Sequence, residues 1–577
     1  MSEQGMVEVP EPRFAPWLME PMRRNRSIYM KVALAAAMIN LFALATSLFT
    51  MVVYDRVVPN NATSSLVALT IGLAIVIIFD FILKTLRAYF VDFAGARIDH
   101  EIGASIFKQL LDIRLDQKKG STGALAGVVR ELETLRDFFA SATITAIVDV
   151  PFILITLAVI AIIGGPVVFV PVAMIPLVIL TGLLTQPAMD RLAAQSMGQG
   201  LQKQSVLVET IGGLEMVKTS GAAPILTERW LGAVEEQGQT ALRQRLVSNL
   251  GVTIAGSAQT ISYAGVVIVG VGLIASRDLT MGGLIACSIL AGRAVAPLGQ
   301  IASLLSRLTS TRTAYRQLNA LMRAPTEGPE GEPLVLARTE GRIEFRNVHF
   351  RYPGASEQAL DGVSFTIQPG EHVALLGRVG SGKSTIARLI LGLYEPQEGL
   401  VMLDGTDIRQ LDPVSLRRRI GSAMQESLLL SGSVRENIVL AREGIDDNEM
   451  IRAAELSGTH QFMGQIANGY DLRLADRGEG LSGGQRQSIA IARALAGRPP
   501  VLLFDEPSSA MDQQTETALL DRLERELTGR TFLVITHRTP FLRLVSRVII
   551  VDRGKVVADG PRDQILAKLN RPKVAAV

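Results

Sequence analysis

The fold of the second half of the chain follows from residues 373–385, which read V-A-L-L-G-R-V-G-S-G-K-S-T. A short apolar strand, Val373–Leu376, leads into the pattern G-x-x-x-x-G-K-S, and a helical pattern, Ile386–Leu393, follows it. In this strand–loop–helix context the pattern is typical of a phosphate-binding loop. Glycines let backbone N–H groups surround a phosphate, and the positive end of the following helix adds to the attraction. The stretch therefore predicts an α/β domain with a nucleotide site.

Within this loop, Lys383 is expected to reach the β- and γ-phosphates, and the Ser384 hydroxyl is expected to ligate Mg²⁺. The complete set of loop residues predicted to contact the nucleotide is Gly377, Arg378, Val379, Gly380, Ser381, Gly382, Lys383, Ser384 and Thr385.

Two further apolar strands end in polar residues that suit phosphate hydrolysis. Val501–Phe504 ends in Asp505 and Glu506, and Phe532–Ile535 is followed closely by His537. Ligands of parallel sheets bind at the carboxyl ends of the strands, so these side chains should share one sheet edge. Attack on a γ-phosphate needs a metal, a positioned water and charge neutralisation. Asp505 is therefore predicted to hold Mg²⁺ through water and Glu506 to polarise the attacking water. A histidine alone is more often structural, but the placement of His537 at the same edge favours a functional role.

The first half of the chain is dominated by long apolar runs. The protein has 577 residues, of which 48% are hydrophobic. A bilayer core needs about 20 mostly apolar residues per helix. Six runs reach that length, and they are Met30–Val53, Leu66–Phe90, Ile144–Ile163, Pro166–Leu184, Gly251–Ala275 and Gly283–Leu305. The alternative is a large soluble helical domain with buried helices, but it does not explain why short connections between the runs alternate with long ones.

The connections between the runs predict their orientation. Val91–Thr143 and Thr185–Leu250 are long, polar and basic, and a basic cluster also precedes the first run. The positive-inside rule places these segments, with the N-terminus, in the cytoplasm. After residue 324 the composition becomes rich in proline and glycine, which marks a domain boundary. The predicted domains are a cytoplasmic segment (1–29), a six-helix transmembrane domain (30–323), a linker (324–340) and an α/β P-loop domain (341–577).

Charge and cysteine content exclude other classes. A formal net charge of +3 argues against nucleic-acid binding, which needs a concentrated basic face. Cys287 is the only cysteine, so no internal disulfide forms, and it is interpreted as a packing residue. Asp149 and Arg293 fall within predicted spans, where a charge costs on the order of 3 kcal/mol. They either line a transport path or are structural, as an ion pair or as side chains that reach the membrane interface.

The motif Leu481-Ser482-Gly483-Gly484-Gln485 gives the sequence a family resemblance. It is the signature of the ATP-binding cassette (ABC) transporters, and the chain resembles their exporters. The resemblance implies that this signature, through Ser482, Gly483, Gly484 and Gln485, contacts ATP bound to the phosphate loop of a second copy. One cassette per chain then implies a homodimer of half-transporters.

Other roles carry over from the resemblance one residue at a time. Tyr352 matches the aromatic residue that stacks on adenine, and Gln425 matches the glutamine that senses Mg²⁺. The implied catalytic residues are Glu506, His537, Gln425 and Lys383, and the implied metal ligands are Ser384, Gln425 and Asp505. ATP and Mg²⁺ are the implied cofactors. Leu115–Gly120 and Thr219–Leu226 fit the two segments that couple the cassettes to the membrane domain.

A narrower resemblance is to the type I secretion branch, which exports unfolded polypeptides from Gram-negative bacteria. Met51–Asn61, Leu290–Leu298 and Glu479-Gly480 carry it. It implies a location in the inner membrane, a periplasmic adaptor and an outer-membrane channel as partners, and a polypeptide cargo. Fewer than 30 residues precede the first run, so no N-terminal peptidase domain is expected.

Three alternatives differ in cargo or in class. The same machine could export a lipid, a glycolipid or a small amphipathic drug. A soluble cassette ATPase of DNA repair or translation is opposed by the six runs and the weak net charge. An ATP-gated channel is opposed by the presence of Glu506, His537 and the signature motif, since a gate needs no turnover.

Overall fold

The computed structural model describes residues 14–117, 121–138, 143–329, 331–336, 338–440, 442 and 444–569. The chain divides into two compact units. The helical unit comprises residues up to Asp112 and Lys119–Ala324, and the α/β unit comprises Ile113–Lys118 and the residues from Pro325 onward.

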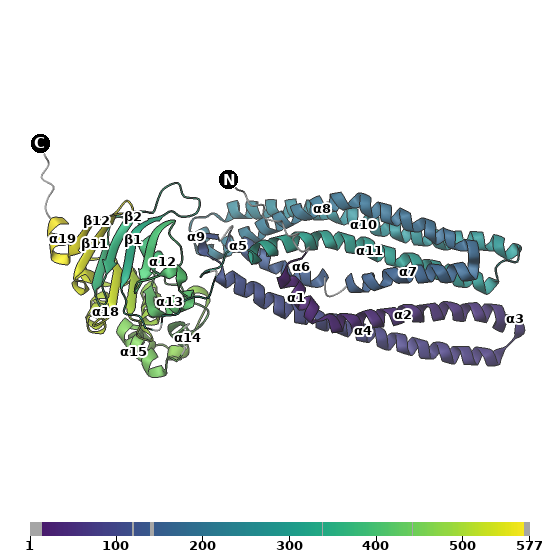
Figure 1. The fold of residues 1–577 in the computed structure, drawn as a ribbon, viewed down its shortest axis with the longest axis horizontal. Helices are drawn as coiled ribbons and strands as arrows, with labels where there is room; N and C mark the ends of the chain where they lie inside the picture. The colour runs from purple at the N-terminus through teal and green to yellow at the C-terminus, as the bar shows by residue number, and fades with distance from the viewer. Residues whose placement is uncertain are drawn as a thin grey trace, which may run out of the picture. The chain divides into compact units, whose positions relative to one another are not determined.

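Long helices make up the helical unit (Figure 1). In chain order its elements are α1 (Pro16–Arg24), α2 (Arg26–Val52), the π-helical turn η1 (Val53–Val57), α3 (Val58–Asn60), α4 (Thr63–Asp112), α5 (Thr122–Arg130), α6 (Leu132–Asp137), α7 (Thr143–Gly164), the 3₁₀ turn η4 (Gly165–Val168), α8 (Phe169–Gly212), α9 (Leu214–Thr219), α10 (Ala223–Ala275) and α11 (Met281–Met322).

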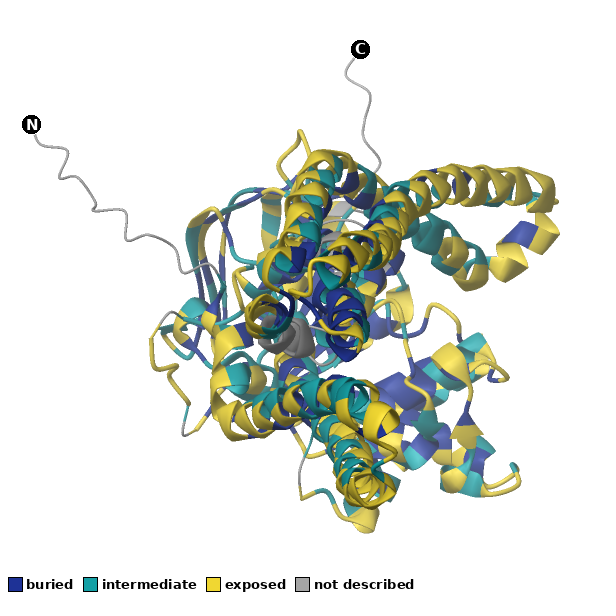
Figure 2. Ribbon diagram, turned by 90° about the vertical axis from the view of Figure 1, so that its right-hand side faces the viewer, coloured by how far each residue is buried: buried dark blue, intermediate teal, exposed yellow. Residues whose placement is uncertain are grey.

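Five helical stretches of the described chain are long and apolar enough to cross a membrane, and they are Arg26–Asn60, Thr63–Asp112, Val150–Gly212, Ala223–Ala275 and Met281–Gly299. The sequence predicts six runs, and the difference arises because α7 and α8 are joined through η4 without a break. The most apolar part of Thr63–Asp112 has no buried residue. Such a surface suits lipid rather than water, since every helical backbone group is already hydrogen-bonded. In Figure 2 the outward faces of the helices are mostly exposed.

The core of the helical unit lies between α7, α8, α10 and α11. Cys287, Leu290 and Ala291 of α11 are fully buried there, with Ile160 of α7 and Val266 of α10. Small residues at such contacts let helix backbones approach closely, which drives helix association in lipid.

Arg293 and Asp149 are the two charged residues predicted within spans, and the structure describes the side chain of Arg293 only. The Arg293 guanidinium donates a hydrogen bond to the backbone carbonyl of Ala43, so it joins α11 to α2. The side chain of Asp149 lies outside the described residues. On α4, Lys84 and Asp80 form an ion pair at 2.6 Å.

The α/β unit contains two main sheets. Its strands are β1 (Ile343–Phe350), β2 (Leu360–Ile367), β3 (His372–Leu376), β4 (Glu398–Leu403), β5 (Thr406–Asp407), β6 (Ile420–Ala423), β7 (Gly432–Ser433), β8 (Arg473–Leu474), β9 (Val501–Asp505), β10 (Thr531–Ile535), β11 (Arg547–Asp552) and β12 (Lys555–Pro561). Its α-helices are α12 (Lys383–Ile390), α13 (Pro413–Arg419), α14 (Val434–Val439), α15 (Asp447–Ser457), α16 (Thr459–Met463), α17 (Gly483–Leu495), α18 (Gln513–Glu526) and α19 (Arg562–Leu569).

Strand order determines where the site forms. The larger sheet has the order β12-β11-β3-β10-β9-β6, in which β11, β3, β10, β9 and β6 are parallel and β12 is antiparallel. The smaller sheet, β2-β1-β4-β5, is antiparallel. Every residue of β9 and β10 is buried, as expected for central parallel strands covered on both faces. Because β3, β10 and β9 are neighbours, their carboxyl ends bring three sequence-distant loops together.

The segment after α11 packs on the α/β unit. Glu327 pairs with Arg417 at 2.7 Å, and Leu334 N–H donates to the carbonyl of Gln410 at 2.8 Å. Residues 113–117 belong to the same unit. Arg114 pairs there with Glu395 at 2.9 Å. Leu115–Gln117 form a 3₁₀ turn, η2, within the first predicted coupling segment, whose residues 118–120 lie outside the described ones.

Phe504 provides a test of the α/β core. Its ring is fully buried and meets Phe532 edge to face at 5.5 Å between centroids. Replacement of a buried phenylalanine by alanine typically costs about 3–5 kcal/mol, through lost burial and the cavity left behind. We expect Phe504→Ala to lower the opening free energy of β9 and β10 by that amount, measured by hydrogen exchange on the full-length protein. Phe504→Leu should cost less, and equal protection in all three proteins would contradict the packing.

Candidate nucleotide-binding site

The predicted phosphate loop connects β3 to α12. A Cβ at Gly377 would lie 2.0 Å from the carbonyl oxygen of Val551, and one at Gly382 would lie 2.5 Å from that of Ala359. Gly382 also has a φ of 105°, which side chains disfavour. Only glycine therefore fits at these two positions, and the loop backbone is held close to its neighbours. This leaves its N–H groups at the start of α12, where anions bind.

Lys383 lies across this loop. Its ammonium group donates to the carbonyls of Gly377 at 2.8 Å and Arg378 at 2.7 Å. Burial lowers the pKa of Lys383, while the nearby charges of Glu506 and Asp505 oppose the shift. A cation is thus held directly against the loop backbone.

Two acidic side chains follow β9. Asp505 is almost fully buried, and burial raises the pKa of its carboxyl, while a hydrogen bond from the Ser384 hydroxyl opposes the shift. Among the described residues, Asp505 Oδ1 and Glu506 Oε2 are buried without a hydrogen-bond partner. Buried polar atoms normally have partners. These oxygens therefore fit a site whose partner is a cation or a water, and a carboxylate with a hydroxyl is a donor set that Mg²⁺ accepts.

Glu506 and His537 form a close pair at the ends of β9 and β10. His537 Nδ1 and Glu506 Oε1 are 2.8 Å apart, with His537 mostly exposed and Glu506 mostly buried. Glu506 has a φ of 51°, an uncommon value for a residue with a side chain. Its N–H donates to the Ile535 carbonyl at 2.9 Å, which holds that backbone in place. One carboxylate oxygen is thus engaged by the imidazole and the other is free.

Gln487 is a further residue of this site, which no sequence pattern indicates. It lies buried on α17, and its amide nitrogen donates to the Glu506 carbonyl at 2.8 Å and to Ser509 Oγ at 3.1 Å. Its amide oxygen accepts from Ala510 N–H at 3.1 Å. The side chain therefore connects the helix after the signature motif to the loop that carries Glu506. A glutamine on an amphipathic helix gives no sequence signal for such a contact.

Tyr352 follows β1 and is held by aromatic neighbours. Its ring meets Phe350 edge to face at 4.9 Å and Tyr394 at 5.3 Å. Its hydroxyl lies 3.1 Å from Thr385 Oγ1 and accepts a hydrogen bond from Arg388 at 2.8 Å. Tyr352 is thus linked to the helix that follows the phosphate loop. The sequence did not indicate Tyr394 or Arg388.

Gln425 and the signature residues make no hydrogen bond to the side chains of Lys383, Asp505 or Glu506 among the described residues. Gln425 is exposed just after β6, at the same sheet edge, and in the described part of the chain its side chain has no recorded hydrogen bond. Ser482 caps α17, accepting from Gln485 N–H at 3.2 Å, while Gln485 Oε1 accepts from Ser482 N–H at 2.8 Å. The signature residues line a separate cavity with Asp512 and Thr515. The structure of one chain therefore does not bring the signature residues to the phosphate loop.

Comparisons with known proteins agree with this geometry. Residues 360–509 match the family described as ABC transporter, and residues 29–298 match the ABC transporter transmembrane region. The chain is 34% identical over 558 residues to the leukotoxin translocation ATP-binding protein LktB of Pasteurella haemolytica-like sp. (strain 5943B), covering 96% of this chain and 78% of that protein. The same protein of Mannheimia glucosida is 33% identical with the same coverage.

A solved structure has the same fold. The structure of a bacterial Atm1-family ABC exporter with ATP bound matches 96% of this chain and 97% of that one, with a TM-score of 0.83 and 23% sequence identity. The helical unit followed by the α/β unit is thus an exporter fold.

Proposed function

Because this chain belongs to the ABC transporters, we propose that it is the ATP-driven exporter of an unfolded polypeptide in type I secretion. It is a multi-pass membrane protein, and its α/β unit binds and hydrolyses ATP. The observation that carries the proposed cargo is similarity along nearly the whole chain, membrane domain included, to proteins named for leukotoxin translocation. A cassette alone would not support it, because cassettes are shared by transporters of many cargoes.

The site residues have separate proposed roles. Lys383 leaves the loop carbonyls and binds the phosphates, together with the N–H groups of the loop. Tyr352 stacks on the adenine. Glu506 orients the attacking water through its free oxygen Oε2 and takes up its proton, while His537 holds Oε1. When bound, Mg²⁺ would neutralise developing phosphate charge, and Ser384, Asp505 and Gln425 are the residues that would hold it.

The separation of the two nucleotide-binding motifs supports a homodimer. In one chain the signature residues and the phosphate loop line different surfaces. A second copy could bring its own signature, Ser482 to Gln485, to the phosphate loop of the first. The N–H groups of Gly483 and Gly484 at the start of α17 would then bind phosphate oxygens. Gln487 would relay the closure to the loop of Glu506, because it contacts that loop directly.

The proposed membrane arrangement has six crossings in the bacterial inner membrane. The chain changes direction at η4, between α7 and α8 (Figure 1), so Val150–Gly212 would cross twice. The basic loops and the N-terminus would be cytoplasmic, as would the α/β unit. A periplasmic adaptor and an outer-membrane channel would complete the export path. In this proposal the transmembrane domain begins at residue 30, the linker at residue 324 and the nucleotide-binding domain at residue 341.

Stimulation of the ATPase tests the cargo class. With the purified protein in phosphatidylethanolamine–phosphatidylglycerol proteoliposomes, we expect β-casein, a naturally unfolded polypeptide, to raise ATP hydrolysis, because occupied transporters turn over faster. Folded lysozyme at the same concentration is the control and should have no effect. Stimulation by added glycolipid or amphipathic drug, with none by β-casein, would instead support the lipid and drug alternative.

A further inference from the structure

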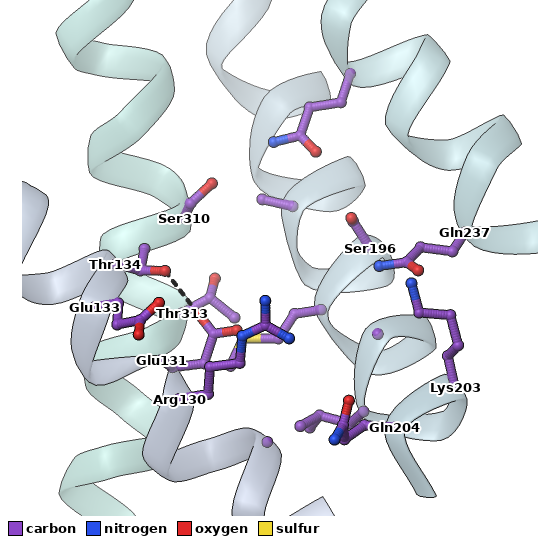
Figure 3. Close-up of a pocket in the computed structure, with 16 residues that line it drawn as sticks. Arg130, Glu131, Glu133, Thr134, Ser196, Lys203, Gln204, Gln237, Ser310 and Thr313 are labelled. Atoms are coloured by element: carbon purple, nitrogen blue, oxygen red, sulfur yellow. Dashed lines mark hydrogen bonds between the residues drawn. The ribbon is translucent and has the colours of Figure 1, made fainter. Parts of the chain in front are cut away.

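A polar cavity of about 430 Å³ lies within the helical unit. Four parts of the chain line it: α5 with the start of α6, the middle of α8, and parts of α10 and α11. Figure 3 shows Arg130 directed into the space between these helices, with Lys203 and Gln237 across that space from it. On α8, Ser196, Gly200 and Gln204 are spaced four residues apart, which places them on one helix face.

Close packing of α5 on α8 shapes one wall of the cavity. A Cβ at Gly127 would lie 2.6 Å from Leu201 Cδ2, and one at Gly123 would lie 2.8 Å from the Cα of Ser205. These two glycines, one helical turn apart, let the helices meet almost backbone to backbone. Gly200 on α8 similarly lies close to the Gln237 amide, since a Cβ there would be 3.2 Å from Nε2. At these glycines, backbone and the Gln237 amide therefore form part of the cavity wall.

The lining is polar and balanced in charge. It contains the amides of Gln204, Gln237 and Gln244, two cations and two carboxylates. Among the described residues, Arg130 and Lys203 make no ion pair and the side-chain amides of the three glutamines make no hydrogen bond. Glu131 accepts one hydrogen bond, from Thr134 Oγ1 at 3.1 Å (Figure 3). The cavity thus presents donors and acceptors of both kinds without a preference for one sign of charge.

The position of the cavity bears on what it can bind. Its α8 and α10 residues lie about 10 Å or more beyond the predicted span ends at Leu184 and Gly251, at 1.5 Å rise per residue. A lipid tail at this level would leave the bilayer, and sites for amphipathic small molecules are lined mostly by apolar side chains. Both considerations favour a water-soluble, polar ligand.

We propose that this cavity binds the backbone of an unfolded polypeptide before export. This inference rests on the proposed function, since it gives the polypeptide cargo an entry site. An extended chain offers one N–H donor and one C=O acceptor per residue that no secondary structure satisfies. A glutamine amide offers both a donor and an acceptor, so Gln204, Gln237 and Gln244 can pair with such a backbone whatever its side chains. The site would therefore accept chains of unrelated sequence.

Binding of fluorescein-labelled β-casein to the full-length protein in nanodiscs, followed by fluorescence anisotropy, tests the site. The double variant Gln204→Leu/Gln237→Leu keeps side-chain size but removes hydrogen bonding. We expect its Kd for β-casein to rise roughly tenfold, the scale for losing two hydrogen bonds. The matched control is Gln202→Leu, an exposed residue on the same helix outside the cavity, whose Kd should equal that of the wild type. Equal Kd values for the double variant and the wild type would overturn the proposal.

A second test measures competition between peptides and labelled β-casein on the wild-type protein. Its result does not depend on whether a variant folds. An unstructured Gly–Ser peptide should displace labelled β-casein, whereas the same peptide methylated at every backbone nitrogen should not, because it lacks N–H donors. Equal competition by both peptides would overturn backbone recognition. Failure of β-casein to bind or to stimulate the wild type would instead contradict the polypeptide cargo itself. A third outcome is that β-casein binds to and stimulates the double variant as it does the wild type, with the methylated peptide competing as well as the unmethylated one. That result would refute the cavity as the binding site and leave the polypeptide cargo standing.

Discussion

Glu506→Gln is expected to lower the rate of ATP hydrolysis by about 10²-fold or more while ATP binding persists, since loss of a general base typically costs 10²–10⁴-fold. Glutamine keeps the size of the side chain, and its amide oxygen can still face His537. It cannot accept a proton from water. The free carboxylate oxygen Oε2, buried without a partner among the described residues, is the atom whose chemistry changes. Steady-state ATPase assays, with equilibrium binding of a fluorescent ATP analogue, measure the two properties separately.

The control for this variant is Glu524→Gln. Glu524 is an exposed residue of α18, and its substitution should leave hydrolysis at the wild-type rate. An unchanged rate in Glu506→Gln would remove Glu506 from the proposed role. A parallel loss of ATP binding would show that the residue acts on the nucleotide rather than on water. Retained binding with a lost rate is the result that the geometry of the Glu506–His537 pair predicts.

Lys383→Ala is expected to weaken ATP binding by about 10²-fold or more, on the scale of about 1.5–3 kcal/mol for each hydrogen bond to a charged group. The ammonium group is the side-chain cation that contacts the loop carbonyls of Gly377 and Arg378. Its removal takes away a positive charge from a partly buried site, where charge interactions are screened less than in water. Equilibrium binding of ATP to the full-length protein in nanodiscs is the measurement.

Two further variants test whether the loss of ATP affinity comes from the missing charge of Lys383 or from a disturbed phosphate loop. Lys383→Met retains most of the side-chain length, so it should lose ATP affinity nearly as fully as Lys383→Ala if the charge matters. Lys568→Ala removes an exposed lysine of α19 and should bind ATP normally. Wild-type affinity in Lys383→Ala would contradict the phosphate-loop interpretation. Recovery of affinity in Lys383→Met would assign the effect to packing of the loop instead.

Local sequence patterns were enough to predict the nucleotide-binding α/β fold of one unit and the membrane helices of the other. The strand–loop–helix pattern around Lys383 predicts its own local structure, because strand burial, glycine φ angles and helix start depend on neighbouring residues. The apolar runs likewise indicate membrane helices, because composition over about 20 residues sets the transfer free energy. The positions of Asp505, Glu506 and His537 at strand ends followed from the same local patterns.

Contacts between segments far apart in the sequence became visible only in the folded chain. The order β3-β10-β9 places His537 Nδ1 2.8 Å from Glu506 Oε1, and no local pattern specifies strand order. No local pattern predicts that Gln487 joins α17 to the loop of Glu506 either. In the helical unit, Arg130 and Gln237 share one cavity although over a hundred residues separate them. A helix pattern indicates which face is polar, but only packing with other helices determines which polar faces meet.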